Sequence, residues 1–527
     1  MKKKHYILFG LLLLAVLLVG VCGYAFRGGA VVIDDYITID RPAKIHPDYT
    51  NTVIPPNIAP LNFQVREPGE RFYVRIYSTE GDVIHVQSGN SSIEISLRRW
   101  KKLLQQNRGQ ELKFDIYTKD NGCWYKYETI TNTIADEDID QYLVYRKIPL
   151  CVTWDRMGTY QRDLSCFDES IVLHNSSYGN GCAHCHSFLN NNPDHMIMQV
   201  RSVSYGTPML MGREGEIAAV NTKTKVTPGK CGFTAWHPSG KIIVFSLNKY
   251  SMMYHNAALE VRDVFDHAAD LALYLVDEKK VMSTVKITDP ERMETMPAWS
   301  PDGKYLYFCS APQRLQEQHK EVLCDLMRIG FDLKTHKWGE LETVLSAQDL
   351  KGSITQPRFS PDGRFILVSV SEYSDFPIHQ AKSDLYLLEV ETGQCSKLPI
   401  NSDRNESWHG FSSKGRWIVF SSKRMDGRFS KPHFSYFDKS GRASKPFVMP
   451  QKDPTYYDSL TLAYNIPELI IKPIEISQKR LAGAIIAYKN VPGANAITGA
   501  TPGVRISFGA AGAKGQQQAW PDAGVRE

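Results

Sequence analysis

Two cysteines and a histidine are the residues of this sequence whose types and spacing point to a specific chemistry. They stand in the segment Gly181-Cys-Ala-His-Cys-His186, as Cys182-x-x-Cys185-His186. This is the pattern of covalent haem attachment, in which two thiols add to the vinyl groups and the adjacent imidazole binds the iron. We therefore predict one haem c, held by Cys182 and Cys185, with His186 as proximal ligand. Thiols three positions apart lie together on one turn of a helix, so the motif is expected to be helical.

Other uses of the two thiols stay open. A structural zinc site would need two further ligands at matching spacing, and the sequence has no second Cys-x-x-Cys. A thioredoxin-like pair would need a βαβ context, which the pattern around Cys182 lacks. A simple disulfide that staples a loop is the main alternative to haem.

The second axial ligand of the iron would be a methionine or a histidine, and methionines are dense just after the motif. A methionine there would raise the redox potential and suit electron transfer, whereas an open face would allow ligand binding. The candidates for this distal position are Met196, Met198, Met209, Met211, His195 and His174.

The N-terminus carries an export signal. Three lysines, Lys2 to Lys4, precede an apolar run from Ile7 to about Phe26. Residues 1–26 are therefore a signal peptide cut near Ala25, or a membrane anchor with the lysines inside. Lipidation of Cys22 is a third outcome, although Val21 is bulky for that signal. We expect the protein in the periplasm or on the outer face of a bacterial membrane, where thiols tend to be paired or bound.

Composition limits the function classes. The net charge of +5 over 527 residues is too small and too dispersed for a nucleic-acid-binding protein. The sequence contains no Gly-x-Ser-x-Gly elbow, no His-Glu-x-x-His helix and no phosphate-binding loop. We expect a binding or electron-transfer protein rather than a classical enzyme, with another envelope protein as its partner.

The composition and the periodicity of apolar residues divide the chain into several regions. After the export segment, residues 27–60 are predicted to be a linker, and residues 61–144 a small sandwich-like β domain with a helix over 96–107. Residues 145–230 carry the haem motif and the first strands of the next domain. A repeat domain follows at 231–468, and a Gly- and Ala-rich tail, expected to be disordered, covers 469–527.

The repeat domain contains four aligned segments. Two of them are Ala298-Trp-Ser-Pro-Asp-Gly-Lys-Tyr-Leu-Tyr-Phe308 and Arg358-Phe-Ser-Pro-Asp-Gly-Arg-Phe-Ile-Leu-Val368. In each, proline and aspartate form a turn, glycine takes its left-handed position, and a short apolar strand follows. The four turn glycines are Gly240, Gly303, Gly363 and Gly415. Four-stranded units repeated at this interval are typical of a β-propeller.

These repeats resemble the TolB-like family of propeller repeats. The resemblance implies six blades, with strands near 196–222 and 458–466 completing the ring. Exported proteins that join a Cys-x-x-Cys-His segment to such repeats are similar in domain order, which supports the architecture and not a reaction.

Two functional hypotheses follow. In the first, the protein is a mono-haem electron-transfer protein, anchored or released outside the cytoplasm, with its propeller as docking platform and the haem at the seam between the two domains. In the second, it is a TolB-like envelope scaffold without a redox role, and the cysteines are structural.

Overall fold

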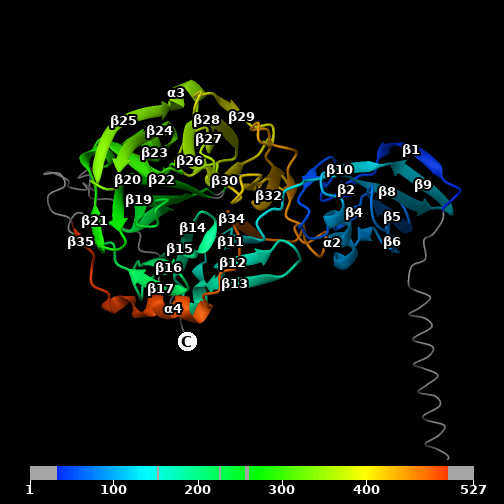
Figure 1. The fold of residues 1–527 in the computed structure, drawn as a ribbon, viewed down its shortest axis with the longest axis horizontal. Coiled ribbons are helices and arrows are strands. Elements are labelled where there is room, and N and C mark those ends of the chain that lie inside the picture. Colours follow the sequence, from blue (N-terminus) through cyan, green and yellow to red (C-terminus); the bar gives the residue numbers. More distant parts are fainter. Residues whose placement is uncertain (1–32, 151–152, 225–226, 256–259, 261, 497–527) are drawn as a thin grey trace, which may run out of the picture.

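The computed structural model describes residues 33–150, 153–224, 227–255, 260 and 262–496. It consists of a small N-terminal β domain beside a larger ring of sheets (Figure 1). The predictions for residues 1–26, including Cys22, lie outside the described residues. Within those ranges, no helix is long and apolar enough to cross a membrane.

The N-terminal domain contains two sheets and one helix. Its seven-stranded sheet comprises β1 (Ile37–Pro42), β3 (Val53–Ile54), β5 (Arg71–Tyr77), β6 (Ile84–Ser88), β8 (Glu111–Asp120), β9 (Cys123–Glu128) and β10 (Ile130–Ile134). The smaller sheet comprises β2 (Ile45–His46), β4 (Phe63–Val65) and β7 (Ser92–Ile93). Val74 of β5, Ile93 of β7 and Trp100 of helix α2 (Leu97–Gln106) pack in one core. The domain is rich in β structure, and its helix lies within the range 96–107 that the sequence predicts.

This domain begins earlier than expected. Strands β1 to β3 fall within residues 27–60, which were predicted to be a linker. The sequence did not indicate these strands, because the stretch is rich in proline and its strands are short. Strand β1 pairs with β9, and β3 with β10, over only a few residues each. Ile54 and Ile58 are fully buried, so the later part of this stretch contributes to the domain core, whereas β1 pairs at the exposed edge of the sheet.

Six sheets form the blades of a propeller. Blade 1 contains β11 (Tyr142–Pro149), β12 (Gly158–Asp163), β13 (Glu169–His174) and β34 (Leu462–Ile470); blade 2 contains β14 (Cys182–Leu189), β15 (Asn192–Arg201), β16 (Met209–Arg213) and β17 (Glu216–Val220). Blade 3 contains β18 (Cys231–Trp236), β19 (Ile242–Tyr254), β20 (Arg262–Leu275), β21 (Lys280–Met282) and β35 (Asn495–Ala496). Blade 4 contains β22 (Arg292–Trp299), β23 (Tyr305–Pro312), β24 (Asp325–Asp332) and β25 (Lys337–Leu345). Blade 5 contains β26 (Ser353–Phe359), β27 (Phe365–Ser371), β28 (Ser383–Glu389) and β29 (Cys395–Lys397); blade 6 contains β30 (Glu406–Phe411), β31 (Trp417–Ser422), β32 (Lys431–Tyr436) and β33 (Phe447–Val448).

The inner strands close the ring in the order β14, β18, β22, β26, β30, β34 and back to β14. Strand β34 comes from the C-terminal part of the chain and pairs with β11, which lies more than 300 residues earlier (Figure 1). This pairing joins the two ends of the propeller in one sheet. The expectation of a six-bladed propeller closed by these segments is confirmed.

The repeated turns of blades 3 to 6 have the geometry that the sequence predicts. Gly303 has φ +71°, its N–H bonds the Ser300 carbonyl, and Oδ1 of Asp302 accepts from the backbone N–H of Lys304. Blade 2 uses a different turn, Asn190-Asn191, with both residues at positive φ. This two-residue turn lacks the Pro-Asp-Gly signature of the aligned repeats, which is why blade 2 was not recognised as one of them.

The C-terminal region is ordered as far as residue 496, so the expectation of a disordered tail from 469 is wrong there. Helix α4 (Gln478–Ala487) buries Leu481 and Ile485 against blades 1 and 2. Strand β35 then adds to the outer edge of blade 3, next to β21. Apolar residues at helical spacing drive this docking, although their Gly- and Ala-rich context resembles a disordered tail. Residues 497–527 lie outside the described part.

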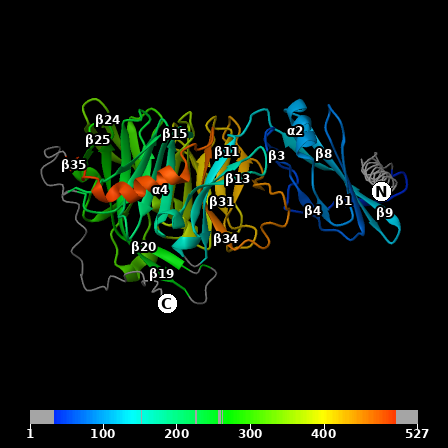
Figure 2. The same ribbon diagram turned by 90° about the horizontal axis from the view of Figure 1, so that it is seen from below.

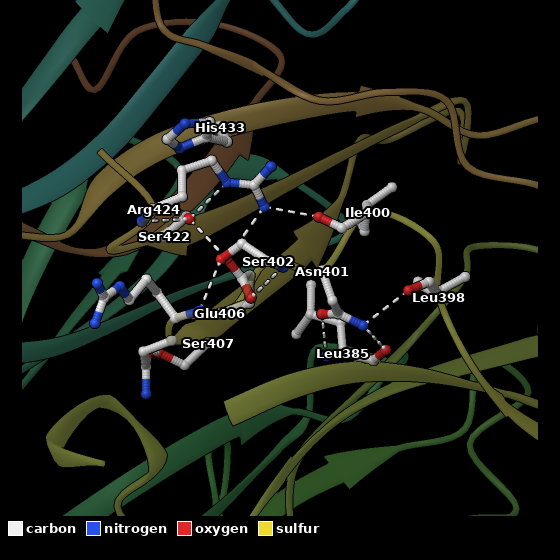
Figure 3. Close-up of polar contacts among 12 residues, drawn as sticks. Leu385, Leu398, Ile400, Asn401, Ser402, Glu406, Ser407, Ser422, Arg424 and His433 are labelled. Atoms are coloured by element: carbon white, nitrogen blue, oxygen red, sulfur yellow. Dashed lines mark hydrogen bonds and ion pairs between the residues drawn. The ribbon is translucent and has the colours of Figure 1, made fainter. Parts of the chain in front are cut away.

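A buried ionic network holds the rim of blade 6. Glu406 is fully buried, and its carboxylate accepts hydrogen bonds from Ser402, Ser422 and Arg424 (Figure 3). The Arg424 guanidinium also donates to the carbonyl of Ile400. The network ties the loop before β30 to the loop after β31.

Short helical segments connect several of these strands. They are α3 (Ala347–Leu350), η1 (Trp154–Arg156), η2 (Asn175–Tyr178), η3 (Val285–Ile287), η4 (Gln316–Glu321), η5 (Pro377–His379) and η6 (Tyr488–Asn490).

Candidate functional site

The Cys-x-x-Cys-His motif lies on β14, the inner strand of blade 2, and not on a helical turn. In a regular strand, residues three apart face opposite sides of the sheet. The register between β14 and β15 shifts between Ala183 and His186, however, as in a β-bulge. As a result, Cys182 and Cys185 line the same cavity. The helical expectation was wrong because the ladder with β15 fixes this segment as a strand.

The bulge belongs to the fold and not to the motif alone. Every inner strand has a register shift at the corresponding place. The residues at these shifts that line the narrow space with Cys185 are Phe233, Met296, Pro297, Gln356, Pro357, Trp408, His409 and Ile466. Cys185 is the second residue of its shift, and the corresponding residues in blades 3 to 6 are Phe233, Pro297, Pro357 and His409.

The cavity lies at one mouth of the central channel. The cavity has a volume of about 160 Å³ and is open to solvent on one side. The wall opposite the motif is largely apolar and aromatic, with Phe233, Tyr250, Phe376 and Trp408. Phe233 stands 5.8 Å, between ring centres, from both Phe376 and Trp408.

A long hairpin from blade 3 covers part of this mouth. Strands β19 and β20 have 13 and 14 residues, whereas the corresponding strands of blade 4 have 8 each. Their outer ends extend beyond the face of the propeller (Figure 2). Tyr250 and Met252 of β19 and Val264 of β20 line the cavity.

The two thiols are unpaired in this structure. Burial raises the pKa of Cys185 to about 11. Nδ1 of His184 lies 3.4 Å from the Cys185 sulfur, and Nε2 of His184 is buried without a hydrogen-bond partner. Burial lowers the pKa of His184 well below its usual value, helped by the positive charges of Arg201 and Arg146. His184 therefore lies beside the thiols as a neutral imidazole.

His186 lies deeper, in a narrower space of about 40 Å³ that adjoins the cavity at Cys185. The side chain is buried, and neither ring nitrogen makes a hydrogen bond of normal geometry. Burial lowers the pKa of His186 to about 3, and the charge of Arg146 adds to this shift. Cys185 is the residue of the motif that joins both spaces.

The candidate distal ligands lie elsewhere. Met196 and Met198 are buried in the apolar core between blades 1 and 2, and Met209 and Met211 pack in the core between blades 2 and 3. His195 stands edge-on to Trp236, and His174 caps helix η2 through its contact with Ser176. None of these six residues lines the described cavity. Strand alternation places the four methionine side chains in the cores between blades instead.

Several cavity residues were missed from the sequence. Met157 and Met252 both line the cavity, as do Arg146 and Arg201. Met157 follows helix η1, and Met252 lies on the long hairpin, so neither is close to the motif in the chain. Only the closure of the ring brings blade 1, blade 2 and the blade 3 hairpin together here.

The site is also not at the seam between the two domains. That seam is made by blade 6 and the segment after it: Nε1 of Trp417 donates to the Glu137 carbonyl, and Asp140 accepts from Ser413. The motif on blade 2 faces the channel instead. Across the described ranges, no group of three or more His, Cys, Asp or Glu side chains is arranged to bind a metal ion, so zinc gains no support.

Comparisons with known proteins give distant similarities. No protein-family model matches the chain. It is 26% identical over 192 residues to the uncharacterized peptidase YuxL of Bacillus subtilis (strain 168), a match that covers 30% of this chain and 26% of that relative. The chain thus spans about a quarter of the length of this curated relative.

Solved structures similar to the chain include propeller proteins. TolB from Acinetobacter baumannii aligns with a TM-score of 0.40 and 14% identity, over 71% of this chain and 85% of that one. A puromycin-hydrolyzing peptidase from Mycobacterium tuberculosis aligns with a TM-score of 0.36 and 10% identity, over 76% and 56% of the two chains. TM-scores and identities this low carry no argument for the fold. The propeller is instead shown by the strand topology of this chain.

Proposed function

We propose that the protein is an exported mono-haem c-type cytochrome-like protein, with the haem attached to Cys182 and Cys185 at the channel mouth. The observation that carries the proposal is the bulge in β14. It turns two unpaired thiols, which a regular strand would separate, toward one cavity.

The residues around the thiols suit such a group. The cavity wall offers aromatic faces for a flat macrocycle, and Arg146 and Arg201 offer cations for its carboxylates. His186 is the proximal ligand that the motif specifies, but it lines the adjoining narrow space and not the cavity. Met157 and Met252 are the methionines on the cavity wall. When bound, haem would supply one-electron transfer.

The size of the cavity sets how the group would sit. The cavity volume of about 160 Å³ is close to the volume of an engineered cavity of about 150 Å³ that takes one benzene ring. A porphyrin is larger than this, so the cavity in this structure does not accommodate the whole macrocycle, and haem attachment would require the mouth beneath the blade 3 hairpin to widen.

In this proposal the rigid propeller frames the haem edge and offers its face to a partner protein of the envelope. The N-terminal segment would direct export and hold the protein at the membrane or be removed.

The test is covalent attachment of haem in cells that express the haem-attachment machinery. We expect a Soret band that stays with the polypeptide after denaturation and solvent extraction, and its loss in the Cys182→Ala, Cys185→Ala double variant. A matched control, Cys123→Ala with Cys395→Ala, removes two unpaired thiols outside the cavity and should keep the band. Wild-type protein without covalent haem under these conditions would overturn the proposal.

A second candidate function is a ligand- or protein-binding propeller without a redox role. The strand conformation of the motif and the small cavity volume favour it, because neither requires a macrocycle. Absence of covalent haem, together with unchanged folding of the double cysteine variant, would select this function.

A further inference from the structure

Two arginines on the cavity wall flank Cys182. Arg146 comes from β11 of blade 1, and Arg201 from the end of β15, where it pairs in register with Cys182. Nη2 of Arg146 lies 3.6 Å from the Cys182 sulfur. The guanidinium of Arg201 lies 4.8 Å from the ring centre of Tyr250 on the long hairpin. Both side chains line the same cavity as the thiols.

Neither arginine has an acidic partner among the residues that the structure describes. Arg146 is 7% exposed, and Nε of Arg201 is buried without a hydrogen bond. Other arginines of the propeller interior are paired: Arg358 bonds Glu468 at 2.5 Å, and Arg424 bonds Glu406 at 3.1 Å. The acid whose charge acts on Arg201 is Asp266, whose carboxylate accepts a hydrogen bond of 2.5 Å from Nδ2 of Asn248 and makes no ion pair with Arg201 within the described residues.

The two guanidinium groups on this wall therefore have no ion-pair partner among the described residues. Lys230, which is exposed, adds to the positive field of the two arginines at His184. Buried charges in proteins are normally paired, because removing a cation from water is costly without a counter-charge. A guanidinium also matches a carboxylate closely, since its fork of N–H donors bonds both oxygens at once. The wall thus lacks an anion that it is shaped to bind.

We propose that Arg146 and Arg201 form a binding site for the carboxylate of a flat aromatic ligand, whose ring lies against Phe233, Tyr250, Phe376 and Trp408. Two sources share this chemistry: the carboxylates of a haem attached at Cys182 and Cys185, or a free aromatic acid. The haem form rests on the proposed function, whereas the free-acid form does not.

The first experiment uses the full chain made without the haem-attachment machinery and titrated with benzoate by calorimetry. Benzoate carries one ring, the size that the cavity volume accepts, and one carboxylate. We expect benzoate to bind and benzamide, the neutral counterpart, to bind at least tenfold more weakly. This comparison needs no variant. Equal binding of the two probes, or no binding of benzoate, would overturn the proposal.

Variants then assign the site. Arg146→Met and Arg201→Met keep the apolar stem and remove the charge, so each should weaken benzoate binding by tenfold or more. Arg146→Lys and Arg201→Lys keep the charge and should retain part of the affinity, which separates charge from a folding defect. Arg213→Met, at an exposed pair with Asp277, is the matched control and should leave binding unchanged. Unchanged benzoate binding in both methionine variants would contradict the assignment.

A last arm identifies the source of the carboxylate. Benzoate is titrated into protein with covalently attached haem, if such protein forms. Loss of benzoate binding there identifies the haem carboxylates as the occupants, and retained binding identifies a free acid. Benzoate binding in a protein that never acquires haem would support the arginine site while the proposed haem function fails.

Discussion

Glu260 and Lys423 form an ion pair that links opposite sides of the channel mouth. Nζ of Lys423 lies 2.5 Å from Oε1 of Glu260 and also donates to the Ile378 carbonyl. Glu260 precedes β20 of blade 3, and Lys423 follows β31 of blade 6. Blades 3 and 6 lie opposite each other in the ring of inner strands. The long hairpin is therefore held across the mouth at its far end.

Breaking this pair should open the hairpin. The Lys423 side chain is 5% exposed and that of Glu260 16%, so Lys423→Met leaves a mostly buried carboxylate without its partner. A cost of about 1–3 kcal/mol to the closed position corresponds to roughly fivefold to 150-fold more of the open form. We expect Cys182 and Cys185 to react with a maleimide faster by about that factor, measured by mass spectrometry at one pH.

The matched control is Lys445→Met, which removes an exposed pair between Lys445 of blade 6 and Asp48 of the N-terminal domain. It should leave the labelling rate of the cavity thiols unchanged. Equal rates in wild type and Lys423→Met would show that the pair does not limit access to the cavity.

The sequence predicted the propeller well because its turns carry strong local signals. The Ser-Pro-Asp-Gly turns of blades 4 and 5 require proline, aspartate and glycine at fixed positions, and these can be recognised from the residues alone. Blade 2 turns at Asn190-Asn191 and blade 1 is completed by β34, so neither carries that signature. Pairing between distant segments leaves no local pattern.

The sequence predicted only those site residues that form a local pattern. Cys182, Cys185 and His186 are adjacent in the chain, so their spacing could be read directly. Their strand conformation could not, because it depends on the ladder with β15. Arg146, Met252 and Trp408 reach the cavity from three different blades, and only ring closure brings them together. The dense methionines after the motif turned out to fill the cores between blades.

The Glu406 network should contribute strongly to stability. Glu406 is fully buried, and Glu406→Ala would leave the charge of Arg424 with only its neutral partners (Figure 3). Removing one partner of a buried ion pair costs about 3–5 kcal/mol. We expect a loss of this size in the free energy of unfolding, measured by urea denaturation. Glu278→Ala, at an exposed pair with Lys280, should change it by less than about 1 kcal/mol. Similar losses in both variants would contradict the role of burial.

The turn glycine of blade 4 should be less replaceable than a glycine of the same conformation elsewhere. Gly303 and Gly393 both have φ +71°, so alanine at either position costs about 1–2 kcal/mol of backbone strain. A Cβ at Gly303 would also stand 2.5 Å from Nε2 of His237, whereas Gly393 has open space. We expect Gly303→Ala to lower the free energy of unfolding by about 1–3 kcal/mol more than Gly393→Ala. Equal losses would mean that the His237 ring moves aside at no cost.

A buried glutamate should make the propeller less stable at high pH. Burial raises the pKa of Glu294 to about 9, with the charges of Asp270 and Asp289 adding to the shift. The folded protein thus keeps this proton up to about pH 9, whereas the unfolded chain releases it near 4.5. Between these values unfolding releases a proton, so the free energy of unfolding falls as the pH rises, by up to about 1.4 kcal/mol per unit.

Replacing this group should flatten the pH profile. Glu294→Gln keeps the shape and cannot titrate, so we expect a smaller decline in the free energy of unfolding, measured by urea denaturation from pH 5 to 9. Burial also raises the pKa of Asp270, to about 7, which adds a decline of the same sign at lower pH. The difference between variant and wild type is therefore clearest from pH 7 to 9. Glu340→Gln, whose side chain is 88% exposed, is the control and should follow wild type. An unchanged slope in Glu294→Gln above pH 7 would mean that Glu294 is already ionised in the folded protein.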